Sequence, residues 1–60
     1  MWKRLWAIRI RYMTGDGKWH KKTTHWYEDL NKAWTEHDEF LMNRKDVLEA
    51  SGAVMHKEGR

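Results

Sequence analysis

The feature that most constrains this chain is a strict alternation of side-chain types near its N-terminus. One set of alternate residues is large and apolar: Trp6, Ile8, Ile10 and Tyr12. The positions between them are small or basic: Ala7, Arg9 and Arg11. Because successive side chains of a β-strand point to opposite faces, the first set belongs in a core and the second in water. The alternation therefore predicts a half-buried strand over residues 3–13.

A glycine-rich turn follows this strand. Gly15 and Gly17 flank Asp16 and supply the positive φ that a tight reversal needs. The chain then returns in a second strand over residues 18–26. The two strands are expected to pair as an antiparallel β-hairpin.

The length of the turn decides the register of this hairpin. A three-residue loop sets Trp6 opposite Trp26 and Arg11 opposite Lys21, whereas a two-residue turn shifts the second strand by one and swaps its faces. We favour the three-residue loop because it brings Trp26 into the core beside Trp6. It also places Ile8 opposite Thr24.

After the hairpin, the spacing of the apolar residues changes from two to three and four. The new stripe consists of Leu30, Ala33, Trp34, His37, Phe40 and Leu41. Polar and acidic side chains lie between them, which is typical of an amphipathic helix. Asp29 is the expected N-cap, where its carboxylate also faces the positive end of the helix dipole. We predict a helix over residues 29–43 that covers the apolar side of the hairpin.

The segment after the helix admits two interpretations. In the first, the apolar stripe continues and Gly52 ends one long helix. In the second, residues 47–55 form a third strand. Its core-facing residues would be Leu48, Ala50, Gly52 and Val54. We favour the strand, because a lone hairpin leaves both sheet edges open and a chain this short needs the added burial.

The predicted architecture is a single α+β domain over residues 1–60 with ββαβ order, the alternative being ββα with a long C-terminal helix. Sixty residues are too few for a second domain. The last residues, 57–60, are expected to fray.

Charge is divided between the two halves of the chain. Residues 1–27 hold seven Lys and Arg against Asp16 alone, whereas residues 28–60 hold five basic and eight acidic residues. There is no cysteine and no apolar run of the length that a membrane helix needs. We therefore expect a cytoplasmic protein that does not associate with membranes.

The order of these elements resembles that of many very small proteins encoded by bacteriophages. A Trp/Ile strand, a Gly-Asp turn, a second strand, an amphipathic helix and a short final strand occur in similar layouts among early-expressed phage proteins that bind and block one host factor. The resemblance spans most of the chain but lies in its layout, so it carries over no site residues. It implies modulation of a host protein by binding, in the host cell cytoplasm.

The outer face of the hairpin is the first candidate site. Its expected binding residues are Arg9, Arg11, Trp19, Lys21 and His25, with Thr23 and Tyr27 in the same rows. Cations beside aromatic rings suit an acidic protein surface, through ion pairs and a Trp anchor. They suit the phosphates and unpaired bases of a nucleic acid as well. The structural alternative is a solvated face, because a two-layer protein exposes one side of its sheet.

Other polar groups give weaker signals. The acidic residues at and after the helix start are interpreted as its solvated side: Glu28, Asp29, Glu36, Asp38 and Glu39. The histidines are His20, His25, His37 and His56, and none has a recognised metal-binding spacing. We expect no metal, no cofactor and no catalytic residues, since the chain also lacks a cysteine nucleophile and a phosphate-binding glycine loop.

These observations predict a small non-enzymatic binding protein, a phage-type modulator or inhibitor of a host protein with an acidic surface. The alternative is a nucleic-acid-binding module that uses the basic side of the hairpin. Open strand edges and a small core also favour a homodimer.

Overall fold

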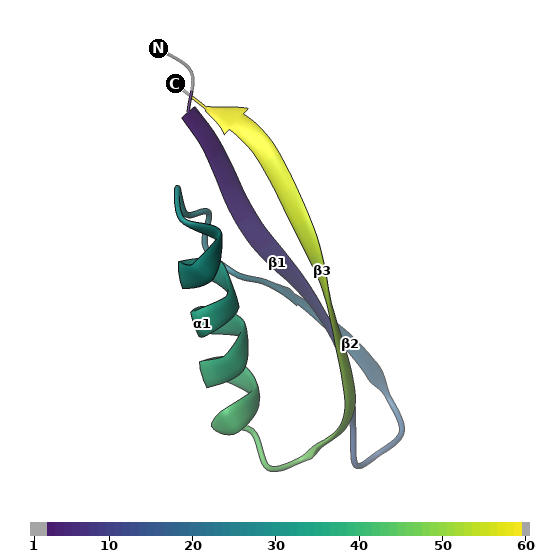
Figure 1. Cartoon of the computed structure of the whole chain (residues 1–60). Helices are drawn as coiled ribbons and strands as arrows, with labels where there is room; N and C mark the ends of the chain where they lie inside the picture. Colours follow the sequence, from purple (N-terminus) through teal and green to yellow (C-terminus); the bar gives the residue numbers. More distant parts are fainter. Residues whose placement is uncertain (1–2, 60) are drawn as a thin grey trace.

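A computed structural model describes residues 3–59, and over this range three strands and one helix form an antiparallel sheet with the helix on one face (Figure 1). The elements are β1 (Lys3–Thr14), β2 (Trp19–Thr23), α1 (Leu30–Met42) and β3 (Val47–Gly59). The strand order is β2-β1-β3, so the alternating strand is central. The predicted ββαβ order is confirmed, and the long C-terminal helix is wrong.

The hairpin has the predicted three-residue turn. The Thr14 backbone N–H donates to the Lys18 carbonyl at 3.0 Å, and the Gly17 N–H donates to the Thr14 carbonyl at 2.8 Å. Gly17 has a φ of 79°, but Gly15 does not have a positive φ, so only one of the two glycines needs its conformational freedom. Arg11 lies opposite Lys21, as the three-residue loop requires.

The second strand ends three residues earlier than predicted, because the chain bulges after Thr23. The ladder pairs Arg9 with Thr23, yet the next bridge joins Trp6 to Tyr27, one residue out of step. Within the bulge, the Thr24 hydroxyl accepts from the Ile8 N–H at 2.9 Å and thereby replaces a missing ladder partner. Pairing of Trp6 with Trp26 is therefore wrong, and Tyr27 takes that position.

The third strand is longer than predicted. β3 pairs with β1 along almost its whole length, from Val47 opposite Thr14 to Gly59 opposite Lys3. Fraying is therefore wrong for residues 57–59, which pair with the start of β1; Arg60 lies outside the described residues. Both strands reach beyond the end of α1 (Figure 1).

The core lies between α1 and the middle of β1. Its buried residues are Ile8, Ile10, Tyr12 and Ala33, with Leu30, Trp34, Phe40, Leu41, Tyr27 and Val47 partly buried against them. The apolar stripes of the first strand and the helix thus meet as predicted, except that Trp6 is only partly buried and lies outside this core. Asp29 caps the helix by accepting from the Asn31 N–H at 2.9 Å.

The core-facing role predicted for the third strand is wrong. Leu48 is 63% exposed and Val54 is 45% exposed, and Ala50 and Gly52 are also exposed. α1 packs against β1, so β3 lies to one side of the helix and most of its side chains are exposed, although Val47 packs against the core. An exception is Gly52, where an added Cβ would lie 3.0 Å from His37 Nε2 and from Ile8 Cγ2.

Candidate functional site

The basic residues predicted for the outer surface come together on the side of the sheet that α1 leaves uncovered. Arg9 and Arg11 lie two apart on β1 and project from the same face, and Lys21 of β2 lies directly opposite Arg11. All three side chains are exposed. Together with Trp19, which follows along the same face of β2, they are called here the basic face.

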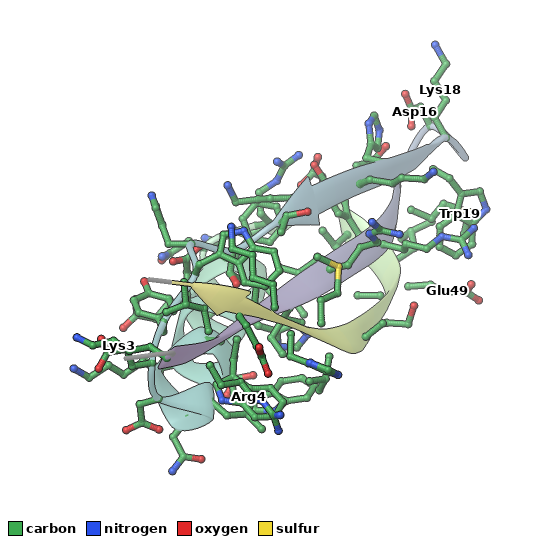
Figure 2. The ribbon with its side chains drawn as sticks, turned by 90° about the horizontal axis from the view of Figure 1, so that it is seen from above. Lys3, Arg4, Asp16, Lys18, Trp19 and Glu49 are labelled. Atoms are coloured by element: carbon green, nitrogen blue, oxygen red, sulfur yellow. The ribbon has the colours of Figure 1, made fainter. Side chains whose placement is uncertain are left out.

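Trp19 provides an exposed aromatic ring within the basic face. It begins β2 opposite Met13 and is 52% exposed. The Arg11 Cζ lies 5.7 Å from the centroid of this ring. Such a stack is worth about 0.5–1 kcal/mol at an exposed site and leaves the guanidinium N–H groups free to bind an anion. Figure 2 shows Trp19 near the hairpin end of the sheet.

The cations of the basic face are not neutralised by the protein itself. Over residues 3–59, none of Arg9, Arg11 and Lys21 forms an ion pair with a carboxylate. By contrast, Lys3 pairs with Glu28 at 3.1 Å and Arg4 with Glu58 at 3.9 Å. Unpaired like charges held on two paired strands create a local positive field that favours an acidic ligand.

Sequence reasoning missed Trp26 and Lys57 as residues of the outer surface. The Lys57 Nζ lies 4.3 Å from the Trp26 ring centroid, although these residues come from opposite sides of β1. The two side chains therefore meet over the outer surface of β1, the side on which Ala7 is fully buried. No pattern in the sequence signals this position, because it depends on the bulge after Thr23.

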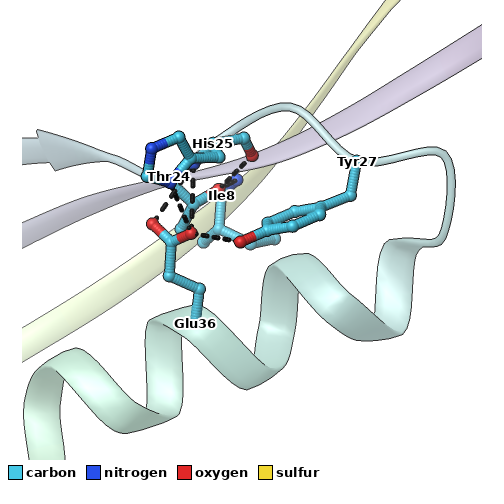
Figure 3. A network of polar contacts seen from close by, with 5 residues as sticks. All are labelled: Ile8, Thr24, His25, Tyr27 and Glu36. Atoms are coloured by element: carbon cyan, nitrogen blue, oxygen red, sulfur yellow. Dashed lines mark hydrogen bonds and ion pairs between the residues drawn. The ribbon is translucent and has the colours of Figure 1, made fainter.

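His25 and Tyr27 do not lie on the basic face, contrary to the prediction. The His25 Nδ1 lies 2.9 Å from Glu36 Oε1, and the Tyr27 hydroxyl donates to the same oxygen at 2.5 Å. The His25 backbone N–H also donates to Glu36 at 3.2 Å. Figure 3 shows this cluster joining the bulged segment to α1. Glu36 is therefore an anchor between two elements, and its interpretation as a merely solvated residue is wrong.

The pKa of Glu36 reflects this environment. Burial alone would raise the pKa of the Glu36 carboxyl, but the hydrogen bonds from Tyr27 and His25 outweigh it and lower the pKa below its ordinary value. The same hydrogen bond raises the pKa of the Tyr27 hydroxyl. Glu36 is therefore ionised at neutral pH and already occupied by protein donors.

An open hollow lies beside this anchor, between the bulged segment and the first turns of α1. Its lining residues are His25, Tyr27, Lys32, Thr35, Glu36 and Glu39. The lining holds one lysine, one histidine and two glutamates, and Glu36 is already bonded to Tyr27 and His25. Within residues 3–59, no group of three His, Asp or Glu side chains is placed to hold a metal ion together.

Comparison with known proteins adds no family to this description. No protein-family model, no curated protein and no solved structure matches this chain. Within residues 3–59, no helix has the length and apolar character needed to cross a membrane.

Proposed function

We propose that this protein is a small non-enzymatic binding protein whose basic face docks onto an acidic surface of another protein. The observation that carries the proposal is the set of unpaired cations Arg9, Arg11 and Lys21 around the exposed Trp19 ring. Interfaces commonly combine an aromatic or arginine anchor with a charged rim, and this surface has both components. Modulation or inhibition of a host protein, which the phage-like layout implies, is part of the proposal.

Rigid support favours this use of the surface. The basic face is built on the central strand, which is paired along both of its edges. Its side chains therefore lose little backbone freedom when a partner binds, and this lowers the entropic cost of association. The small-residue neighbours Ser51 and Ala53 on β3 leave Arg11 and Arg9 accessible from that side.

The proposal can be tested by charge reversal. Arg9→Glu/Arg11→Glu is expected to retain the circular dichroism spectrum and the thermal midpoint, because exposed charges contribute little to stability. It should lose partners that the unmodified protein captures from a bacterial lysate, since attraction to carboxylates becomes repulsion. The matched control is Lys32→Glu/Lys45→Glu, which makes the same change in net charge at exposed residues outside the basic face.

Two results would contradict the proposal. If the Arg9→Glu/Arg11→Glu protein is folded and still binds a captured partner with unchanged affinity, measured with purified components, the basic face is not the interface. If the Lys32→Glu/Lys45→Glu control loses binding equally, net charge rather than this surface is responsible.

Nucleic acid is the second candidate, and the Arg11–Trp19 stack favours it, because an exposed ring beside a cation can stack on an unpaired base. The two candidates differ in their response to salt. Neutralising three phosphates would give a slope of log affinity against log salt of about −2 for single strands and about −3 for duplex DNA. A protein interface with an apolar anchor should show a shallower dependence. Captures should therefore be repeated after nuclease treatment, and the affinity measured across a salt series.

A further inference from the structure

The outer edge of β3 lacks the usual protection over its middle; the register shift in its pairing with β1 lies near the start of the strand, opposite Met13 and Thr14. β3 has 13 residues and pairs with β1 on one side, while no strand within residues 3–59 covers its other side. The chain contains no proline, and the stretch from Ala50 to Met55 contains no charged residue. Proteins normally block such edges with charges, prolines or bulges, because they pair readily with another strand.

The backbone groups that this edge offers can be assigned from the pairing of β1. The N–H and carbonyl groups of Trp6 and the carbonyl of Ile8 bond toward the β2 side. Since these directions alternate along a strand, Arg9 and its odd-numbered neighbours bond toward β3. Ala53, opposite Arg9, therefore points its backbone groups inward.

The residues of β3 between the inward-pointing ones present their backbone groups to solvent. They are Ala50, Gly52, Val54 and His56. The helix does not obstruct this edge, because α1 packs against β1. Val54 is 45% exposed, and nearby Leu48 is 63% exposed, so apolar surface lies beside the free backbone groups. An incoming strand would find both hydrogen-bond partners and apolar contacts.

We propose that the strand added to this edge is β3 of a second copy of the chain, paired antiparallel about a two-fold axis at Ala53. In this register the backbone of Gly52 bonds with that of Val54 in the second copy. Glu49 then lies opposite Lys57 of the second copy, and by symmetry this charge pair occurs twice. Both residues lie on the outer face, on the same side as Arg9.

Charge complementarity selects this register over its neighbours. Because outward backbone groups must meet outward groups, the alternatives differ by a shift of two residues in the pairing. One shift sets Glu49 opposite Met55, and the other sets it opposite Gly59. Only the register centred on Ala53 pairs every charge of residues 49–57 with an opposite charge.

The dimer is a continuous six-stranded sheet whose two basic faces lie on the same side. Arg9 is opposite Ala53, and Ala53 is opposite its own copy, so the two Arg9 side chains share one row across the sheet. Three strand spacings separate them, about 14 Å. Only alanine side chains lie between them in this row.

Cysteine cross-linking tests the register directly, because the chain contains no cysteine of its own. Ala53 lies in a non-hydrogen-bonded pair with its copy, where Cα atoms are about 4.5 Å apart, within the range of a disulfide, about 4.4–6.8 Å. Ala53→Cys should therefore oxidise to a covalent dimer in dilute solution. The matched control is Ser51→Cys on the same face, whose copies lie about 13 Å apart along the strand and should therefore form no disulfide within the dimer.

Charge exchange provides the second arm. Glu49→Lys places two lysines opposite each other twice, and we expect sedimentation equilibrium to show an approximately tenfold weaker dimer. Glu49→Lys/Lys57→Glu restores the complementary pairs and should restore dimerisation, while Glu39→Lys makes the same charge change on α1 and should leave it unchanged.

The proposal fails if the unmodified protein sediments as a monomer up to high micromolar concentration. It also fails if Ser51→Cys cross-links as readily as Ala53→Cys, or if Glu39→Lys weakens the dimer as much as Glu49→Lys. A monomer that binds an extended peptide along β3 would assign the edge to a different partner and overturn the second copy as occupant.

Discussion

Removing the charge of Glu36 should uncouple the bulged segment from α1. Glu36 accepts from the Tyr27 hydroxyl at 2.5 Å and from the His25 backbone N–H at 3.2 Å, and its side chain is only 20% exposed. In Glu36→Gln, the amide oxygen can still accept one of these two hydrogen bonds. The amide NH2 group is itself a donor and therefore cannot accept the other. Hydrogen bonds to a charged group contribute about 1.5–3 kcal/mol each, so we expect a loss of about this size in the free energy of unfolding.

The exposed His25 ring should add little to this loss in the free energy of unfolding. Its side chain is 85% exposed, and ion pairs at such positions contribute little. For a domain of this size, each 1 kcal/mol lowers the thermal midpoint by about 4–8 °C, so the Glu36→Gln midpoint should fall by about 6–24 °C. Thermal unfolding followed by far-ultraviolet circular dichroism measures this, and Glu39→Gln, at an exposed carboxylate on the same helix, is the matched control.

The dependence on pH has a definite sign. The pKa of Glu36 is lowered in the folded protein from an ordinary value of 4.5. Its stabilisation is therefore fully present above the unfolded-state pKa and is lost as the pH falls through the folded-state pKa. The difference in stability between the unmodified protein and Glu36→Gln should shrink as the pH is lowered below about 4.5.

A double-mutant cycle with Tyr27→Phe identifies the partner. If the Tyr27 hydroxyl contributes as the structure indicates, the losses from Glu36→Gln and Tyr27→Phe will be less than additive. Additive losses, or a Glu36→Gln midpoint equal to that of the unmodified protein at neutral pH, would refute the reasoning that Glu36 anchors the segment.

Five further substitutions test other parts of the fold. Val54→Asp should lower the free energy of unfolding in urea by about 1 kcal/mol or less, because Val54 is exposed. Ile10→Asp should abolish folding, because Ile10 is fully buried. Gly17→Ala should destabilise by about 1–2 kcal/mol because of its φ of 79°, while Gly15→Ala, with its nearest atom 4.0 Å away, should be neutral or slightly stabilising in the same assay. Trp26→Ala should cost about 1–3 kcal/mol by thermal unfolding, since it removes the stack on Lys57 and uncovers the surface of β1.

The parts of the fold that follow from local pattern could be predicted from the sequence. The alternation around Ile8 and Ile10, the glycine turn and the cap at Asp29 each depend on a few neighbouring residues. The hairpin register followed from the loop length. The position of Arg9 and Arg11 on one exposed face followed from the same alternation, so four residues of the candidate surface could be found in advance: Arg9, Arg11, Trp19 and Lys21.

The bulge after Thr23 could not be predicted, because it is decided by tertiary contacts. A regular strand would place Trp26 against α1, where Trp34 and Phe40 already occupy the space around a small core. With one extra residue, Tyr27 enters that side and reaches Glu36, while Trp26 crosses the opposite face. His25 moves with this shift, and therefore the one predicted binding residue beyond Thr23 lies away from the others.

The exposure of β3 follows from a mismatch of lengths within the molecule. The 13-residue helix is about 20 Å long, whereas the 12 residues of β1 extend over about 40 Å. One helix of this length can cover about half of one strand, and the fully buried side chains Ile8 and Ile10 lie accordingly near the middle of β1. Backbone pairing with β1 holds the rest of β3, whose large apolar side chains gain little burial from their own chain. The strand that the sequence pattern assigned to the core is for this reason the one to which we assign the contact with a second copy.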